Sequence, residues 1–279
     1  MNITTALKLF RDYQKSNLKP NTAIGYRYLL DNFKELFGER DLASISSEEI
    51  FQFLDLLTEN NCRSTKRHRY SQLKAFFNFV IMNYELGLTN PLDSPLLRKT
   101  FRLPKPKQRE IIAKGLIDEV IFNSKNLRDR VLLELQSSCG ARIGEVLKIR
   151  VKDIDERKIT VHNPKSGREV EVIFMPEQVA NRLKTYIQEE GLREEDRAFN
   201  LCYGTARTMI NKLGKKVGIR LNPHDLRRHS ATFASSNGVT LEIISKVLLR
   251  HQNLKTTQVY LGKVSDSEAI RWMDILHGK

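Results

Sequence analysis

Apolar side chains recur at helical spacing through the first part of the chain, up to about residue 90. One such series stops at Gly38, a residue type that commonly ends helices. Ser46 and Glu49 have the spacing of a capping box ahead of a second series, and a third runs over residues 64–84. An Asn-Pro pair at 90–91 closes the region. This pattern predicts a domain built only of helices.

The later part of the chain mixes the helical period with the alternating period of β-strands. Two short segments alternate, 158–162 and 169–173, and the Asn-Pro-Lys-Ser-Gly stretch between them has the composition of a hairpin turn. Helical spacing recurs in the segments 116–122, 127–136, 143–149, 176–187, 205–217, 226–235, 241–249 and 265–276. We therefore predict a fold that is mainly α with a small antiparallel β-sheet.

The stretch between these two regions is basic and contains prolines. Residues 97–108 hold Pro104, Pro106 and five Lys or Arg, which is typical of an extended linker. The predicted organisation is a helical domain over 1–95, a basic linker over 96–108, and a second domain over 109–279 of α+β type that ends in a tail helix.

The chain has 279 residues, a formal net charge of +14 and a pI near 9.7. Residues 1–108 hold 17 basic against 11 acidic residues and the remainder 30 against 22, so both parts are basic. A polyanion such as a nucleic acid is the partner this charge favours, although a merely soluble basic protein is the alternative. No apolar run approaches the roughly 20 residues of a membrane span, and the first residues lack the pattern of a signal peptide. We expect a cytoplasmic protein without a membrane partner.

The three cysteines, Cys62, Cys139 and Cys202, are odd in number and far apart, without the spacing of a zinc site. We expect reduced, mostly buried thiols and no metal.

A basic cluster opens the helix predicted over 64–84, and it comprises Arg63, Lys66, Arg67, His68 and Arg69. Acidic partners four positions away, which a salt-bridged surface would show, are missing from it. Contact with DNA phosphates is predicted, supplying affinity and salt dependence. A solvated helix face is the alternative.

A set of cations with one late tyrosine has the residue types that metal-free phosphoryl transfer through a phosphotyrosine needs. A phenol with a pKa near 10 is a poor nucleophile at pH 7 unless cations lower its pKa or a base takes its proton. Each residue alone also has a structural reading: Arg142 as an ordinary partner of Glu145, and Tyr260 as a packing residue. The candidates are Arg142, Lys165, His224, Arg227, His251 and Tyr260.

Their sequence context resembles the motif boxes of the tyrosine recombinase (phage integrase) family. The boxes are Gly140 to Glu145, the hairpin Lys165, His224 to His229, Leu248 to His251 and Thr256 to Tyr260. The N-terminal helices are similar to the core-binding domain of that family. The resemblance implies a site-specific DNA recombinase that cuts and rejoins DNA through a 3′-phosphotyrosine, without ATP, metal or cofactor. It also implies a tetramer acting on two double-stranded DNA sites through a Holliday junction.

The resemblance assigns the proton transfers and the nucleophile. Tyr260 would attack the phosphate while His224 helps to move its proton. Lys165 would protonate the departing 5′-oxygen, with Lys158 as the next candidate.

The resemblance also assigns the groups that stabilise the negative charge on the phosphate. Arg142 and Arg227 would fork onto the nonbridging oxygens, and His251 would donate a further hydrogen bond. Glu145 and Asp225 would orient these cations or cap helices.

Two positions depart from the family pattern. Arg250 stands where a small Gly commonly precedes the His, so it would contact DNA or shift His251. The hairpin has Asn-Pro-Lys-Ser-Gly in place of Gly-Lys-Gly. Further expected DNA contacts are Lys105, Lys107 and Arg228.

Two other functions remain open at this point: strand nicking and rejoining of the type IB topoisomerase kind, and a DNA-binding regulator without enzymatic activity. The tail segment 265–276 is expected to dock on a neighbouring protomer, or else to pack on its own domain.

Overall fold

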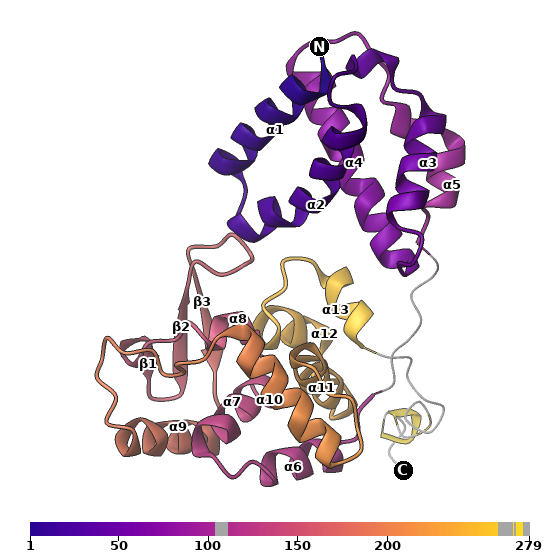
Figure 1. Ribbon diagram of the computed structural model, residues 1–279. Coiled ribbons are helices and arrows are strands. Elements are labelled where there is room, and N and C mark those ends of the chain that lie inside the picture. Colours follow the sequence, from indigo (N-terminus) through magenta and orange to yellow (C-terminus); the bar gives the residue numbers. More distant parts are fainter. Residues whose placement is uncertain (104–110, 262–269, 271, 276–279) are drawn as a thin grey trace. The chain divides into compact units, whose positions relative to one another are not determined.

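A computed structural model describes residues 1–103, 111–261, 270 and 272–275, with the backbone alone at 259 and 260. The chain divides into two compact units, Met1–Lys107 and Gln108–Lys279. Figure 1 shows helices throughout the first unit and a small sheet among the helices of the second. The fold is thus mainly helical with a three-stranded antiparallel sheet, as the periodicities predict.

The first unit packs its helices around aromatic side chains. Phe33, Phe76 and Phe77 are each at most 1% exposed and meet edge to face, which adds directional contacts to the apolar burial. The helices are α1 (Ile3–Asn17), α2 (Pro20–Phe37), α3 (Ser47–Leu57), α4 (Arg63–Asn83) and α5 (Pro95–Thr100), with 3₁₀ turns at Leu42–Ser44 and Pro91–Asp93. The capping box predicted ahead of α3 is present, with Ser46 and Glu49 bonded to each other's backbone N–H.

The linker prediction is wrong for its first residues. Residues 95–100 form α5, and Leu97 and Phe101 are buried at 0% and 2% exposure in the core of the first unit. The Phe101 ring stacks on Tyr70 at a centroid distance of 5.4 Å. Apolar packing at positions i and i+4 therefore outweighs the basic composition around them. Lys105 and Lys107 lie outside the described residues.

The second unit carries the sheet, in the order β1-β2-β3. Its strands are β1 (Ile154–Asp155), β2 (Lys158–His162) and β3 (Val170–Phe174), and the β2–β3 register joins Lys158 to Phe174 and His162 to Val170. The predicted hairpin is thereby confirmed. Asn163 and Gly167 take positive φ values of 48° and 86° on either side of Lys165, whose side chain is exposed in the turn.

Helices surround the core of this unit. They are α6 (Lys114–Phe122), α7 (Leu127–Ser137), α8 (Ile143–Val146), α9 (Glu177–Glu189), α10 (Tyr203–Lys216), α11 (Pro223–Ser236), α12 (Leu241–Ile243) and α13 (Leu254–Tyr260). The last seven residues of α7, Val131 to Ser137, are all buried, and α9 and α11 both contact this helix. The helix predicted over 241–249 begins as α12 and continues as a π-helical turn at Ile244–Leu248. No helix in the described ranges is long and apolar enough to cross a bilayer.

Candidate active site

Gly140 brings the loop before α8 into close contact with the end of the π-helical turn. Its φ is +60°, and a Cβ added there would lie 3.0 Å from the carbonyl oxygen of Leu248. A side chain at this position would therefore be strained and would push the two segments apart. The close approach sets Arg142, two residues later, beside the loop that carries His251.

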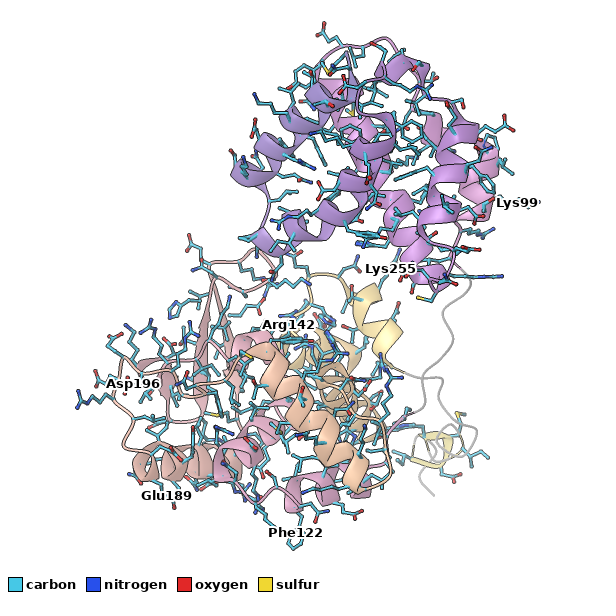
Figure 2. All side chains as sticks on the ribbon, in the orientation of Figure 1. Lys99, Phe122, Arg142, Glu189, Asp196 and Lys255 are labelled. Atoms are coloured by element: carbon cyan, nitrogen blue, oxygen red, sulfur yellow. The ribbon has the colours of Figure 1, made fainter. Side chains whose placement is uncertain are left out.

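Two guanidiniums converge on the same loop. Arg227, on α11, donates to the carbonyl oxygens of Gly140 and Leu249. Arg142 Nη2 lies 3.4 Å from the same Leu249 oxygen. The Arg227 residue is 1% exposed, whereas the Arg142 side chain is 20% exposed. The structure thus brings together two of the predicted cations through one shared acceptor; Figure 2 labels Arg142.

His251 joins these cations through its ring. Its Nε2 lies 3.2 Å from Arg227 Nη2, and its Nδ1 lies 2.9 Å from Thr257 Oγ1. Because a guanidinium only donates, Nε2 accepts and Nδ1–H donates to the threonine hydroxyl. Burial, and then the charges of Arg227 and Arg142, lower the pKa of His251 to about 4. The imidazole is therefore neutral at pH 7 in the free protein.

His224 and Lys165 lie near the same charges. The His224 ring reaches solvent in the first turn of α11, yet the surrounding protein displaces part of its water. This desolvation, followed by the charge of Arg227, lowers the pKa of His224, and Lys165 contributes to the same shift. Lys165 is hence within electrostatic range of His224, as a shared site requires.

Tyr260 is the last residue of α13, nine positions after His251. Its side chain lies outside the described part of the structure, so its role as nucleophile stays a prediction.

Glu145 and Glu171 hold the guanidinium of Arg142 from two sides. Glu145 Oε1 lies 2.6 Å from Arg142 Nη1, and Glu171 Oε2 lies 3.6 Å from it. Burial by itself would raise the pKa of Glu145, but Arg250 and Arg142 together lower it, so the carboxylate is charged at pH 7. The orienting role expected of Glu145 fits this geometry. Glu171 was missed by the sequence analysis.

Arg250, which was expected to contact DNA or to shift His251, lies buried in the second unit. Arg250 is 3% exposed, with Nη2 2.8 Å from Glu145 Oε2 and Nε 3.2 Å from Glu171 Oε2. A buried guanidinium needs such partners, because removing it from water without them is costly.

Asp225 caps the N-terminus of α11. Its Oδ2 accepts from the backbone N–H of Asn222 at 3.0 Å, which satisfies the capping alternative given above. Arg228 Nη1 lies 3.6 Å from the other carboxylate oxygen of Asp225.

The basic cluster at the start of α4 is partly engaged within its own unit. Lys66 Nζ lies 3.4 Å from Asp55 Oδ1 on α3, so one cluster member has an acidic partner from another helix. Arg69 donates to the carbonyl of Gly25 at 2.9 Å, and Arg67 stacks over a tyrosine ring. Arg63 and His68 are exposed.

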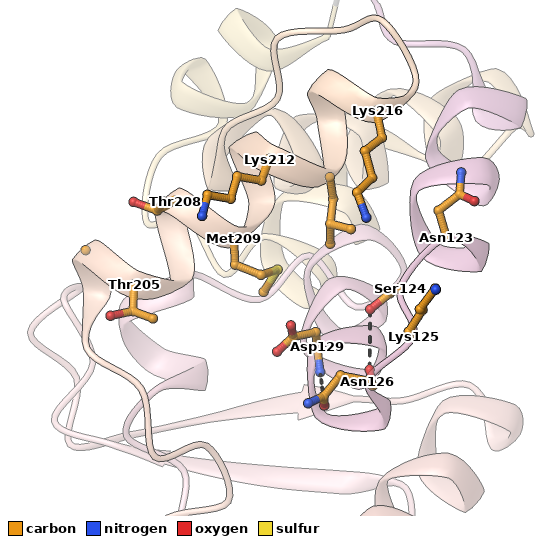
Figure 3. A pocket seen from close by; sticks show the side chains of 12 residues that line it. Asn123, Ser124, Lys125, Asn126, Asp129, Thr205, Thr208, Met209, Lys212 and Lys216 are labelled. Atoms are coloured by element: carbon orange, nitrogen blue, oxygen red, sulfur yellow. Dashed lines mark hydrogen bonds between the residues drawn. The ribbon is translucent and has the colours of Figure 1, made fainter.

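A hollow of about 650 Å³ lies elsewhere in the second unit, between the α6–α7 turn and α10. Figure 3 shows Lys125, Lys212 and Lys216 around it, together with Asn and Thr side chains. None of the predicted site residues lines it. Across the described ranges, no group of three His, Cys, Asp or Glu residues could hold a metal ion. The cation cluster thus remains the candidate site.

Two of the three cysteines contradict the expectation of mostly buried thiols. Cys62 and Cys202 are exposed at the N-caps of α4 and α10, and only Cys139 is buried.

Comparison with known proteins accounts for both units. The model of the Phage integrase family matches residues 109–266, and that of the phage integrase N-terminal SAM-like domain matches residues 7–83. The chain belongs to the phage integrase family. The resemblance inferred from the motif boxes is confirmed.

Relatives match over most of their length. The tyrosine recombinase XerA of Saccharolobus solfataricus is 37% identical over 236 residues, covering 82% of this chain and 78% of the relative. The tyrosine recombinase XerC of Chlamydia caviae is 29% identical over 295 residues, covering 92% and 93%.

Solved structures share the fold. The Tn1549 transposon integrase in complex with transposon right end DNA superposes with a TM-score of 0.78 at 17% identity, and each chain is fully covered. A lambda integrase dimer bound to a COC′ core site gives 0.74 at 19% identity, covering 93% of this chain and 95% of the other. At such identities the likeness establishes the architecture alone.

Proposed function

We propose that this protein is a site-specific DNA recombinase that cuts and rejoins strands through a covalent 3′-phosphotyrosine. The observation that carries the proposal is the convergence of Arg142 and Arg227 on the Leu249 carbonyl, with His251 bonded to Arg227. The names of its relatives, tyrosine recombinases XerA and XerC, support the same activity.

In the proposed reaction the Tyr260 hydroxyl oxygen attacks the scissile phosphorus in line. The new bond joins the Tyr260 oxygen to phosphorus, and the bond between phosphorus and the 5′-oxygen breaks. His224, neutral because its pKa is lowered, takes the phenol proton. Lys165 gives a proton to the departing 5′-oxygen. Attack by the 5′-hydroxyl of another strand reverses these steps and releases Tyr260, so the bond energy is conserved and no ATP is consumed.

The two guanidiniums stabilise the charge that grows on the nonbridging oxygens. Each terminal nitrogen of a guanidinium carries two N–H groups, so Arg142 can keep its long contact to the Leu249 carbonyl while donating to a phosphate oxygen. Because Arg227 Nη2 already donates to Leu249 and His251, we assign the phosphate contact of Arg227 to Nη1. Their backbone contacts preorient them before DNA arrives. Little reorganisation is then needed in the transition state.

Basic side chains outside the site contact the DNA backbone in this proposal. They supply affinity that falls with salt, and sequence choice comes from other contacts. The residues assigned to this role are Arg63, Lys66, Arg67, Arg69, Lys105, Lys107 and Arg228. Arg250 is left out because its guanidinium is held by the carboxylates of Glu145 and Glu171.

The active assembly is a tetramer on two DNA sites, joined through a Holliday junction. One structural neighbour is described as a lambda integrase tetramer bound to a Holliday junction, which supports this assembly. The tail segment 265–276, most of which lies outside the described residues, is proposed to dock on the adjacent protomer; packing on its own domain is the alternative, which the nearness of Trp272 to Gly238 supports. We place the protein in the cytoplasm, associated with the DNA of the cell.

The decisive test replaces Tyr260 by Phe, which removes only the attacking oxygen. Tyr260→Phe is expected to shift a target duplex in a gel as the wild type does, while giving no covalent adduct on a nicked suicide substrate. An adduct with Tyr260→Phe would overturn the assignment. A wild type that relaxes supercoils but joins no two sites would indicate topoisomerase activity, and binding without any adduct would indicate a regulator.

A further inference from the structure

The residues on either side of His251 both hold the hairpin that carries Lys165. Arg250, before it, donates through Nε to Glu171 Oε2 on β3 at 3.2 Å. Gln252, after it, donates through Nε2 to the backbone carbonyl of Ser166, the residue next to Lys165. Two bonds therefore join the His251 loop to the hairpin, one at the strand and one at the turn.

The bond at the strand is buried. Arg250 has a φ of +52°, a left-handed conformation that turns its side chain back into the unit. The guanidinium also donates to Glu145 at 2.8 Å and to the Leu248 carbonyl at 3.0 Å. Because Glu171 is 4% exposed, breaking its contact with Arg250 would leave the buried carboxylate with only the longer contact to Arg142, which is costly. β3 is accordingly fixed to the His251 loop.

The bond at the turn restrains the residues around Lys165, which lie beyond the end of the strand pairing. The β2–β3 ladder ends at the pair His162 and Val170, and the residues between them form the turn that presents Lys165. Within the described hydrogen bonds, Gln252 is the contact from the His251 loop to that turn. Its amide therefore limits how far the turn bends away from the site.

We infer that Arg250 and Gln252 form a clamp that sets the Lys165 hairpin in register with His251. The inference rests on the proposed function. Both are positioning residues: they act through Lys165, which donates the proton to the 5′-oxygen, and do not touch the DNA themselves. Loosening the turn lowers the fraction of time that Lys165 spends within reach of that oxygen, so it slows the acid-dependent part of cleavage.

The test compares two suicide substrates, a normal one and one whose scissile 5′-oxygen is replaced by sulfur. A thiolate leaves readily without a proton, so the sulfur substrate removes the need for Lys165. Gln252→Ala is expected to slow single-turnover cleavage of the normal substrate on the order of tenfold and to cleave the sulfur substrate at the wild-type rate. DNA affinity should stay within about twofold, because a side chain acting through Lys165 adds no phosphate contact. Lys165→Ala should show the same selectivity with a larger defect.

Gln188→Ala is the matched control, since Gln188 is exposed on α9, and it should behave as wild type on both substrates. The double variant Arg250→Gly with Glu171→Val removes the buried pair and also one contact of Arg142 and one of Glu145. It should therefore slow cleavage of both substrates, and that of the normal substrate more than that of the sulfur substrate.

Equal slowing on both substrates, or no slowing of Gln252→Ala on the normal one, would refute the clamp while wild-type adduct formation upholds the proposed function. Failure of sulfur to rescue Lys165→Ala would also refute it, because the hairpin would then not carry the acid. A wild type that forms no adduct with either substrate would defeat the proposed function and the clamp together.

Discussion

Exchanging either site arginine for lysine keeps the charge but removes the forked geometry, and the two exchanges should differ in their effect on stability. Arg227 is 1% exposed, and its two terminal nitrogens hold the carbonyls of Gly140 and Leu249. Lysine has one nitrogen and can keep one of these bonds. Arg142 is partly exposed, and a lysine there can keep its ion pair with Glu145.

The magnitude follows from the bond that is lost. A hydrogen bond to a charged group contributes about 1.5–3 kcal/mol, and for a unit of this size each kcal/mol shifts Tm by about 2–4 °C. Arg227→Lys should therefore lower the Tm of the second unit by about 3–12 °C. Arg142→Lys should cost less than about 1 kcal/mol, because its contacts to carbonyls are long, at 3.4 Å, and its side chain meets solvent.

Thermal unfolding followed by circular dichroism measures the loss of stability. Single-turnover cleavage, assayed well below both melting points, measures the loss of activity. Both variants should cleave about a hundredfold more slowly or worse, because the fork onto the phosphate is lost in each. A wild-type Tm for Arg227→Lys, or a larger loss for Arg142→Lys, would show that these backbone contacts do not hold the site together. Wild-type cleavage by either variant would move that residue out of the site.

Two further predictions concern titration. The pKa of His251 is about 4 in the folded protein against an ordinary 6.5, so the unfolded state binds more protons between these pH values. The free energy of unfolding should therefore fall as pH drops from about 6.5 towards 4, and it should fall by less in His251→Asn. Parallel curves of unfolding free energy against pH for the two proteins would refute the shift. Iodoacetamide at pH 7 should label Cys62, whose pKa the hydroxyls of Ser64 and Thr65 lower to about 6, and spare Cys139, whose pKa burial raises to about 12. Peptide mass mapping checks this, and labelling of Cys139 in the folded protein would contradict it.

Local patterns were sufficient for most elements of the fold. The period of the apolar residues predicts α2, α3 and α4, and the capping box ahead of α3 is read directly from two residues. The hairpin follows from alternation on both sides of a turn. The cations and the tyrosine could be named because the motif boxes keep their spacing along the chain. These features depend on neighbours in sequence, which a single sequence displays.

Contacts between distant residues could not be read in the same way. In the segment 169–173 the alternation of Glu and Val suggests that the valines face inward, yet Val170 is 46% exposed and Glu171 is 4% exposed. The reversal has a physical reason: Glu171 pairs with Arg250, 79 positions away. A buried position could not be inferred for either charge without knowledge of the other, so the sequence indicated neither the burial of Arg250 nor the part played by Glu171.

The π-helical turn was also invisible to periodicity, yet it explains why one loop can hold three arginines. Carbonyls at the end of a helix have no partner within it, and they form the negative end of the helix dipole. The carbonyls of Leu248, Leu249 and Arg250 emerge where the π-helical turn ends. Each of these carbonyls accepts from a guanidinium. Arg250 donates to Leu248, Arg142 and Arg227 both donate to Leu249, and Arg142 also donates to the carbonyl of Arg250. Because the same backbone leads directly into His251, the positions of the cations and of the imidazole are set by one short segment rather than by independent side-chain contacts.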